Sequence, residues 1–289
     1  MVTDQDFTSA ILRLISGIMT INSEKQTKLP REDRILPRMP GLDNGTGIVL
    51  ARARECPPDH IIDWHTHERA QLLYAVRGVM RVTTANGVWV VPSQRAVWIP
   101  PGISHHVQAQ GTPLSLRSLY IRDDALNGLP DICCVVTVSP LLRELIIAAM
   151  DIPDEPVPDS AEERLIRVLL DRIEGLPVAP LHLPMASDKR ARRVIDTLMD
   201  DPADPRTLQD WSHELGASER TLARIFTRET GMTFGQWRQQ VKLLAALARL
   251  ARGDGVTDVA FDLGYASQSA FIAMFRRALG RTPGRYFSE

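Results

Sequence analysis

The stretch Ser218-Glu-Arg-Thr-Leu-Ala-Arg-Ile-Phe226 decides the fold of the C-terminal part, because its pattern returns later in the chain. In each copy a serine precedes apolar residues at helical spacing, and a glycine follows them. Serine is a favoured helix N-cap and glycine a favoured residue after a helix end. An offset of 49 residues relates the pairs Ser218 and Ser267, Leu222 and Phe271, Phe226 and Phe275, Gly231 and Gly280, Thr233 and Thr282, and Trp237 and Tyr286. The repeat predicts helices over Glu219–Thr230 and Gln268–Leu279.

A shorter predicted helix precedes each of these two helices. Leu208–Glu214 leads through Leu-Gly-Ala to Ser218, and Val256–Asp262 leads through Leu-Gly-Tyr-Ala to Ser267. Two short helices joined by a turn that contains glycine are the signature of a helix-turn-helix unit. The helix predicted between the units, Phe234–Ala251, would be about 27 Å long at 1.5 Å per residue. Successive major-groove openings on one face of DNA are about 34 Å apart, so one chain could place both second helices in neighbouring grooves.

Charge is distributed unevenly along the chain. From residue 218 onward there are 11 Lys or Arg against 6 Asp or Glu, whereas residues 1–186 hold 18 against 22. A basic excess that coincides with the repeat favours a nucleic-acid partner. The composition, 44% hydrophobic and 24% charged, is that of a globular protein. Because no long apolar run, signal peptide or disulfide framework is evident, we expect a cytoplasmic protein without a membrane partner.

The N-terminal half has a different pattern. Between residues 46 and 138, short β-rich runs are separated by turn signals such as Asn86-Gly87, which predicts a β-sandwich or barrel. Two helices are expected next, to Met150 and to about Glu174; Ser139 caps the first, and Ser160 with Glu163 forms a capping box for the second. The expected architecture is an α+β protein of two domains with four segments: a poorly ordered arm (1–45), a sensing domain (46–138), linker and dimerisation helices (139–186) and an all-α domain (187–289).

Histidines in the β-rich part have a spacing that suggests metal ligation. His65 and His67 alternate on a strand and can face one side, followed by Gln71 and later by His105. This spacing resembles the two cupin motifs, which implies a β-barrel in which these four residues hold a divalent metal. Three imidazoles and one amide oxygen suit several transition metals. The alternative is that the histidines only line a ligand pocket or form hydrogen bonds in the core, so we expect no required cofactor, with a divalent metal as an option.

Residues 187–289 resemble the DNA-binding domain of AraC/XylS-type regulators through the quoted stretch, Gly231–Phe234 and Phe275–Phe287. The resemblance implies that both second helices face the major groove of double-stranded DNA. By position, the DNA-contacting residues are Ser218, Arg220, Ala223 and Arg224 in the first unit and Ser267, Gln268, Ser269 and Ile272 in the second, with Arg228, Arg276, Arg277 and Arg281 on phosphates. Ala273 replaces an arginine that is common in the family, so the second unit is expected to discriminate bases less.

The run Gln71–Ala85 with Arg95–Pro101 is similar to a subgroup of these regulators that carries a cupin sensor. This similarity implies a small-molecule effector and control of a neighbouring transporter or catabolic gene. We further expect a homodimer formed through residues 140–174, RNA polymerase as a further partner, and no enzymatic activity. Two alternatives remain open: a metal-dependent cupin enzyme, against which Gln71 in place of an acid argues, and an architectural DNA-binding protein without a ligand. The effector, the operator and the sign of regulation do not follow from the sequence.

Overall fold

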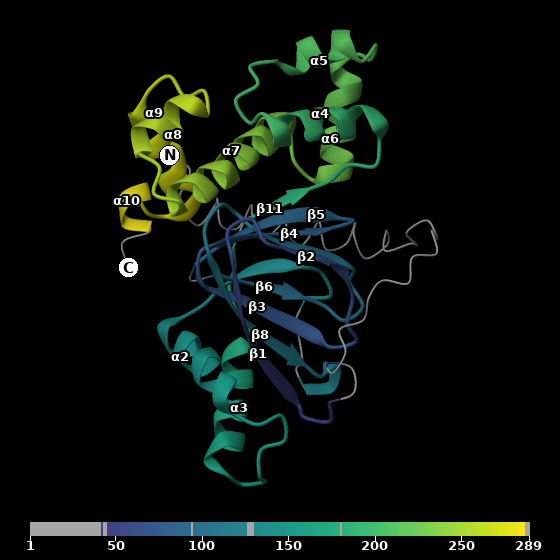
Figure 1. The fold of residues 1–289 in the computed structure, drawn as a ribbon. Coiled ribbons are helices and arrows are strands. Elements are labelled where there is room, and N and C mark those ends of the chain that lie inside the picture. The colour runs from purple at the N-terminus through teal and green to yellow at the C-terminus, as the bar shows by residue number, and fades with distance from the viewer. Residues whose placement is uncertain (1–41, 43–44, 94, 126–129, 180, 287–289) are drawn as a thin grey trace. The chain divides into compact units, whose positions relative to one another are not determined.

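The computed structural model describes residue 42 and residues 45–93, 95–125, 130–179 and 181–286. The chain divides into two compact units, one of residues 34–182 and one that contains residues 183–289 (Figure 1). The predicted arm, residues 1–45, lies outside the described residues except for Leu42 and Gly45. No helix in the described ranges combines the length and apolarity that crossing a membrane requires.

The first unit is built from antiparallel strands that alternate between two sheets. The eight principal strands are β1 (Val49–Cys56), β2 (Ile61–His65), β3 (Ala70–Arg77), β4 (Val79–Thr84), β5 (Gly87–Pro92), β6 (Arg95–Ile99), β7 (His105–Ala109) and β8 (Leu114–Ile121). One sheet has the order β1–β8–β3–β6, and the other β5–β4–β7–β2. This order is that of a jelly roll, the architecture of cupins. The predicted cupin-like fold is therefore confirmed, in the form of two sheets.

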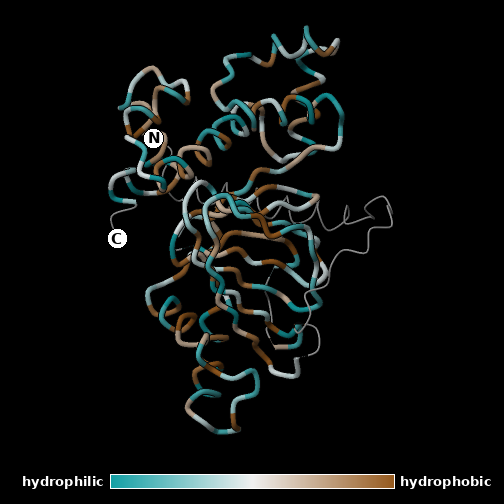
Figure 2. The backbone as a smooth tube through the Cα atoms, viewed as in Figure 1, coloured by the Kyte–Doolittle hydropathy of each residue, from teal (hydrophilic) through white to brown (hydrophobic). Residues whose placement is uncertain are grey.

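Short strands and helices complete the first unit. β9 (Cys134–Thr137) pairs with β6, and β10 (Val178–Ala179) pairs with β9. The short strand β11 (His182–Pro184) lies where the division between the units falls. A 3-10 turn, η1 (Asp123–Ala125), follows β8. Hydrophobic and hydrophilic residues mix along the strands in Figure 2, and burial alternates along β4 and β7, as is common in antiparallel sheets with one face toward the core.

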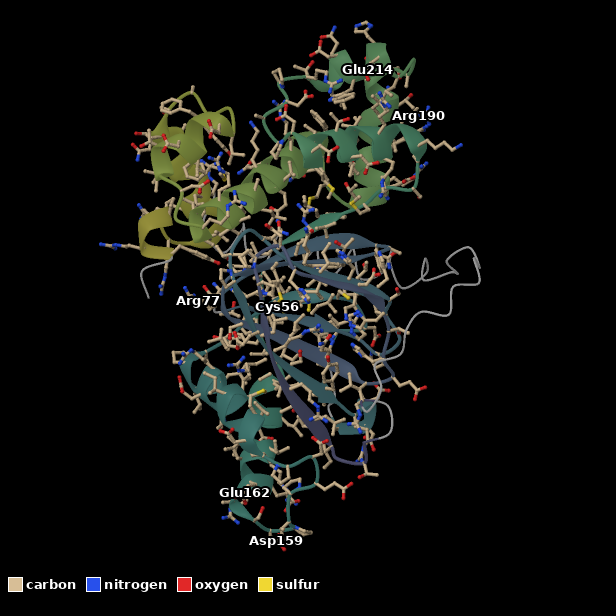
Figure 3. The ribbon with its side chains drawn as sticks, in the orientation of Figure 1. Cys56, Arg77, Asp159, Glu162, Arg190 and Glu214 are labelled. Carbon is tan, nitrogen blue, oxygen red and sulfur yellow. The ribbon has the colours of Figure 1, made fainter. Side chains whose placement is uncertain are left out.

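Two helices cover the outer face of the first sheet. α2 (Pro140–Ala148), continued by the 3-10 turn η2 (Ala149–Asp151), and α3 (Ala161–Ile173) form one hydrophobic core with strands β1, β3, β6, β8 and β9. Ser139 caps α2 as predicted. The capping box predicted at Ser160 is only half formed, because the Glu163 carboxylate accepts from the backbone N–H of Asp159, one residue earlier. Asp159 and Glu162 mark this end of α3 in Figure 3.

One strand of the second sheet, β7, was not predicted, and the strand expected at His65 and His67 ends at His65 as β2. β2 carries exposed Ile61 and Trp64, and β7 begins with two consecutive histidines, so neither reads as a half-buried apolar run. β2 pairs with β7, and β7 pairs with β4. Both strands form because neighbouring strands supply hydrogen-bond partners, and tertiary context of this kind outweighs local β-propensity.

The second unit is helical, as predicted. Its helices are α4 (Lys189–Asp200), α5 (Leu208–Glu214), α6 (Glu219–Thr230), α7 (Phe234–Ala251), α8 (Val256–Asp262), α9 (Gln268–Leu279) and α10 (Pro283–Tyr286). α5 with α6 and α8 with α9 form the two expected helix-turn-helix units, and α7 joins them. Six large apolar residues of these helices are fully buried: Trp211, Leu222, Phe226, Trp237, Phe271 and Phe275.

Candidate nucleic-acid interface and histidine site

The two second helices, α6 and α9, begin and end as their sequences require. The Ser218 hydroxyl accepts from the N–H of Thr221, and the Ser267 hydroxyl accepts from the N–H of Ala270, each at 3.2 Å. Gly231 and Gly280 follow the helices with φ of +70° and +76°, a conformation that favours glycine. Both predicted serines therefore serve as N-caps, and their contact with DNA stays a prediction.

The exposed face of α6 is positively charged. Arg220 and Arg224 are exposed, and no carboxylate of the described residues pairs with either. Ala223, which lies between them, is half-buried, while Leu222 and Phe226 point into the core. A helix with a buried apolar side and unpaired guanidinium groups on the other side can present them to base edges or phosphates.

The exposed face of α9 is different in chemistry. Gln268, Ser269 and Ala273 are exposed and uncharged, and Ile272 is half-buried. Arg276 and Arg277 are exposed in the last turn of the helix. The structure thus gives α9 polar and small side chains over its first turns and cations only at its end.

Other arginines of this unit are held by acids. Arg190 pairs with Asp188 at 2.8 Å, Arg192 with Asp196 at 2.9 Å, and Arg249 with Asp254 and Asp262, each at 2.8 Å. Arg206 pairs with Asp204 and Glu214 and lies over the Trp211 ring; Figure 3 labels Arg190 and Glu214. In these pairs a carboxylate neutralises the arginine charge, which would otherwise attract DNA.

Two of the predicted phosphate contacts already have partners within the chain. Arg228 donates to Glu229 at 2.8 Å, and Glu229 also accepts from the N–H groups of Ser187 and Asp188. Arg281 has a partner within the protein as well. Either arginine would have to exchange a protein partner for a phosphate, whereas Arg276 and Arg277 would not.

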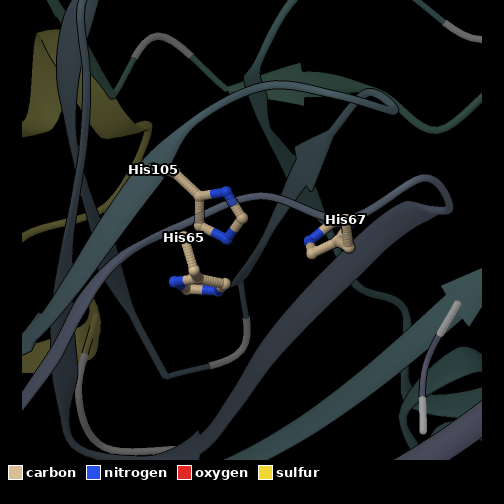
Figure 4. A group of neighbouring side chains, drawn as sticks. All are labelled: His65, His67 and His105. Atoms are coloured by element: carbon tan, nitrogen blue, oxygen red, sulfur yellow. The ribbon is translucent and has the colours of Figure 1, made fainter. Parts of the chain in front are cut away.

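In the first unit, three histidines from separate places in the sequence meet in the interior (Figure 4). His65 ends β2, His105 begins β7, and the two are opposite each other in the pairing of these strands. His67 follows β2. The ring centroids lie 4.2 Å apart for His65 and His105, 5.1 Å for His67 and His105, and 6.1 Å for His65 and His67. All three side chains are buried.

Backbone carbonyls fix the protonated nitrogen of each ring. The Nδ1 atoms of His65, His67 and His105 lie 2.7, 2.6 and 2.9 Å from the carbonyl oxygens of Asp63, Arg69 and Ile103. Each Nδ1 must donate there, because a carbonyl only accepts, so each neutral ring keeps an unprotonated Nε2. Burial lowers the pKa of His65, and it lowers the pKa of His105 to about 3, so both rings are neutral at physiological pH.

Gln71 joins the cluster from β3. Its Oε1 lies 3.2 Å from His67 Nε2, and its Nε2 donates to the Ser118 hydroxyl on β8. Because His67 is protonated on Nδ1, its Nε2 is an acceptor, and so is the Gln71 Oε1 atom that it faces at 3.2 Å. Rotating the amide by half a turn would satisfy His67 Nε2 with a donor, and a cation between the two atoms would satisfy both without rotation. In addition, the fully buried Nε2 of His105 has no hydrogen-bond partner among the described residues.

These residues have the composition of a metal site. One ligand atom of each histidine lies within 4.8 Å of the others. A tetrahedral ion with bonds of about 2.1 Å needs its ligand atoms about 3.4 Å apart, so small side-chain rotations would close the site. The carbonyl bonds to Nδ1 are the type of outer contact that orients histidine ligands. Buried, neutral, preoriented imidazoles thus fit a divalent transition metal, with Gln71 as a neutral fourth ligand.

The sequence did not single out three residues around this cluster. Ser118 accepts a hydrogen bond from the Gln71 amide, and the backbone carbonyl of Arg69 accepts one from His67. The rings of Tyr120 and His67 meet nearly at right angles, with centroids 5.2 Å apart. The guanidinium of Arg69 donates to backbone carbonyls of Leu42, Gly45, Gly47 and Ile48. The position of Arg69, two residues after His67 beside a buried strand, was the signal available in the sequence.

Each of the two units matches a known protein family. Residues 211–289 match a family model described as a helix-turn-helix domain, and residues 47–179 match one described as an AraC-like ligand binding domain. The chain is 40% identical over 225 residues to the HTH-type transcriptional regulator NimR of Escherichia coli K12, covering 78% of this chain and 82% of that protein. The chain therefore belongs to the family of AraC-type helix-turn-helix transcriptional regulators with an AraC-like ligand-binding domain.

The resemblance to NimR covers most of the chain, while that to the regulatory protein SoxS covers about a third of it. The chain is 35% identical over 100 residues to the regulatory protein SoxS of Salmonella typhimurium, covering 33% of this chain and 94% of that one. Among solved structures, ToxT of Vibrio cholerae aligns with 82% of this chain and 97% of its own, at 10% identity and a TM-score of 0.35. The protein is a ligand-responsive, DNA-binding regulator of transcription.

Proposed function

We propose that this regulator binds an operator as a homodimer in the cytoplasm, has no enzymatic activity, and reads DNA mainly through α6. The observation that carries the proposal is the pair of exposed arginines without carboxylate partners, Arg220 and Arg224, one turn apart on a capped helix. A guanidinium can form two hydrogen bonds to the O6 and N7 atoms of guanine. Ala223 is close enough to the same surface to contact a thymine methyl group.

The second recognition helix supports binding more than base discrimination in this proposal. Gln268, Ser269 and Ile272 offer weaker or fewer base contacts than an arginine, and Arg276 and Arg277 supply charge for phosphates. Arg228 and Arg281 contribute to phosphate binding after they leave their partners in the protein.

Operator selection in vitro with the full chain tests this assignment. Random-sequence DNA is selected with the parent protein and with an Arg220→Ala, Arg224→Ala variant, with an Arg192→Ala variant as the control on the acid-paired surface. The parent and the control should select the same motif, and the double variant should lose guanines from one segment of it. An unchanged motif in the double variant would contradict base reading by α6.

We also propose that α2 and α3 carry the dimer contact. Their inner faces are used inside the unit, where Leu142, Ile146 and Leu169 pack on the sheet. Their outer surface keeps large apolar side chains exposed, Leu141 at 55% and Val168 at 41%. Sedimentation of the parent and of a Leu141→Glu, Val168→Glu variant tests this. A parent that sediments as a monomer, or a variant that sediments as a dimer, would refute the assignment.

The effector proposal has a specific form at the histidine cluster. We propose that His65, His67, Gln71 and His105 hold a divalent transition metal that is part of the sensor; the support is the unpartnered Nε2 of buried His105 and the facing acceptors of His67 and Gln71. A bound metal would supply a Lewis-acid contact to the effector. The test is metal analysis after dialysis, in which the parent should retain about one metal per chain and a His105→Ala variant none. A parent protein that contains no metal and does not bind added zinc would refute the proposed metal site.

Chromatin immunoprecipitation of the full chain identifies the regulated genes. We propose that the bound sites lie beside a transporter or catabolic gene, and that bound protein contacts RNA polymerase there. Sites scattered without relation to promoters would instead favour an architectural role.

A further inference from the structure

We infer that the sensor takes an organic acid: its carboxylate pairs with Arg54, and a hydroxyl group of the same molecule meets the Nε2 atoms of the histidine cluster, directly or through a metal that they hold. This inference rests on the proposed function of the first unit as the effector-binding part. It adds the chemical class of the effector and a residue that recognises it.

Strand register places Arg54 on the side of the sheet that faces the histidines. In β1, Leu50, Arg52 and Arg54 alternate onto one face, opposite Tyr120, Ser118 and Leu116 of β8. Ser118 accepts from Gln71, which contacts His67, so this is the inner face. The other face of the sheet, with Val49 and Leu119, is the one covered by α2 and α3.

Arg54 lies where an outside molecule can reach it. β1 is an edge strand of one sheet and β2 is an edge strand of the other, and His65 ends β2. The Arg54 side chain is exposed, whereas His65 and His105 are buried. A ligand that touches both therefore extends from the exposed Arg54 side chain to the buried imidazoles.

The charge of Arg54 is not neutralised by the protein. Arg52, two residues earlier, forms a two-bonded ion pair with Asp154 at 2.7 Å, and Glu55 is engaged by Ser115 and Arg117. Arg54 only approaches His60 Nε2 at 3.5 Å, and no carboxylate in the described ranges pairs with it.

The buried part of the site needs a donor or a cation. The three rings keep unprotonated Nε2 atoms because their Nδ1 atoms donate to carbonyls, and His105 Nε2 has no partner among the described residues. An unpaired buried acceptor costs free energy, which a ligand hydroxyl or a coordinated metal ion would recover. A cation at the edge and acceptors in the interior together select a molecule with an acid group at one end and a hydroxyl at the other.

Binding of paired probes to the full chain tests this directly. Glycolate and the three hydroxybenzoates are each compared with the neutral amide of the same molecule, by histidine ring signals in NMR spectra of the parent protein. At least one acid should bind saturably at millimolar concentration, shift the signals of His65 and His105, and bind about fivefold or more tightly than its amide, since a carboxylate adds a charge-assisted pair with Arg54. An Arg54→Gln variant should bind that acid and its amide equally.

Arg77→Gln is the matched control, because Arg77 is an exposed arginine six residues from Gln71 along β3, about 20 Å away at 3.3 Å per residue. It should keep the preference for the acid. Equal binding of acid and amide by the parent, no saturable binding of any acid, or an unchanged preference in Arg54→Gln would each overturn the inference. Far-ultraviolet circular dichroism checks that the variants fold. Because the titrations contain no DNA, a failure of operator binding would be detected separately and would leave this result unaffected.

Discussion

Replacing Arg224 with alanine is the most informative single change in the recognition surface. Arg224 is exposed in the middle of α6, and no carboxylate of the described residues holds it. Its full capacity for hydrogen bonding is therefore available to DNA, and no ion pair within the protein has to break first. Alanine is the best helix former, and the buried side of α6 is unchanged, so the fold should be retained.

The expected loss follows from the contact that is removed. A bidentate arginine–guanine contact contributes about 1–3 kcal/mol of discrimination against the wrong base, which corresponds to a factor of about 5–150 in affinity. Arg228→Ala provides a comparison for the loss of affinity, because Arg228 must first break its ion pair with Glu229 before it can bind DNA. Breaking that pair costs up to about 1 kcal/mol. We expect Arg228→Ala to weaken binding less, and by a similar factor for every DNA sequence.

Fluorescence anisotropy with a selected operator and with each single base-pair substitution measures both effects. For Arg224→Ala, one base-pair substitution that harms the parent should cease to matter, while the others keep their cost. Arg192→Ala, a change in an exposed arginine paired with Asp196, should stay within about twofold of the parent. If Arg224→Ala instead weakens binding equally at all substituted operators, Arg224 contacts phosphate only and base reading by this residue is refuted.

Three further changes test other parts of the structure. Arg276→Ala should reduce the slope of log affinity against log salt by about 1, as expected for one lost phosphate contact, and an unchanged slope in anisotropy titrations would remove Arg276 from the interface. Arg69→Met should lower the free energy of unfolding in urea by about 2–3 kcal/mol, because backbone carbonyls of Leu42 and Gly47 lose a charged donor, whereas exposed Arg77→Met should cost less than about 0.5 kcal/mol; similar losses for both would contradict a structural role of Arg69. Asp154→Asn should release Arg52 on the inner face and raise the affinity for an organic acid about twofold or more in the probe titrations, and an unchanged or lower affinity would show that Arg52 does not contribute to binding the acid.

The helical unit was predictable because its signals are local. Each of α6 and α9 consists of a capping serine, twelve helical residues and a glycine with positive φ, all within about fifteen positions. The pattern occurs twice in the sequence because of the repeat. Local backbone preferences of this kind act the same way in any context. The predicted boundaries of α6, α7 and α9 therefore agree with the structure to the residue.

The sequence predicted which residues form the histidine cluster, but not which residues contact them. The spacing of His65, His67, Gln71 and His105 brought them together in the prediction, and the structure places them together. Their partners are distant in sequence: Ser118 follows Gln71 by 47 residues, and Asp154 follows Arg52 by 102. Such contacts depend on the register of β1, β3 and β8, which no short pattern in the chain specifies.

The two helix-turn-helix units differ in more than their base-facing residues, and the differences agree in direction. Thr207 and Asp210 form a capping box at the start of α5, whereas Gly255 at the start of α8 provides no side-chain hydrogen bond. Between the turn glycine and the capping serine, the first unit has only Ala217, and the second has Tyr265 and Ala266. A missing cap costs about 1 kcal/mol, and a longer turn constrains the second helix less. The first unit, whose helices are better fixed, also carries Arg220 and Arg224, whose hydrogen bonds to bases need exact placement. The second unit carries Arg276 and Arg277, whose attraction to phosphate tolerates small displacements. Sequence discrimination should therefore depend on the first unit and overall affinity on both.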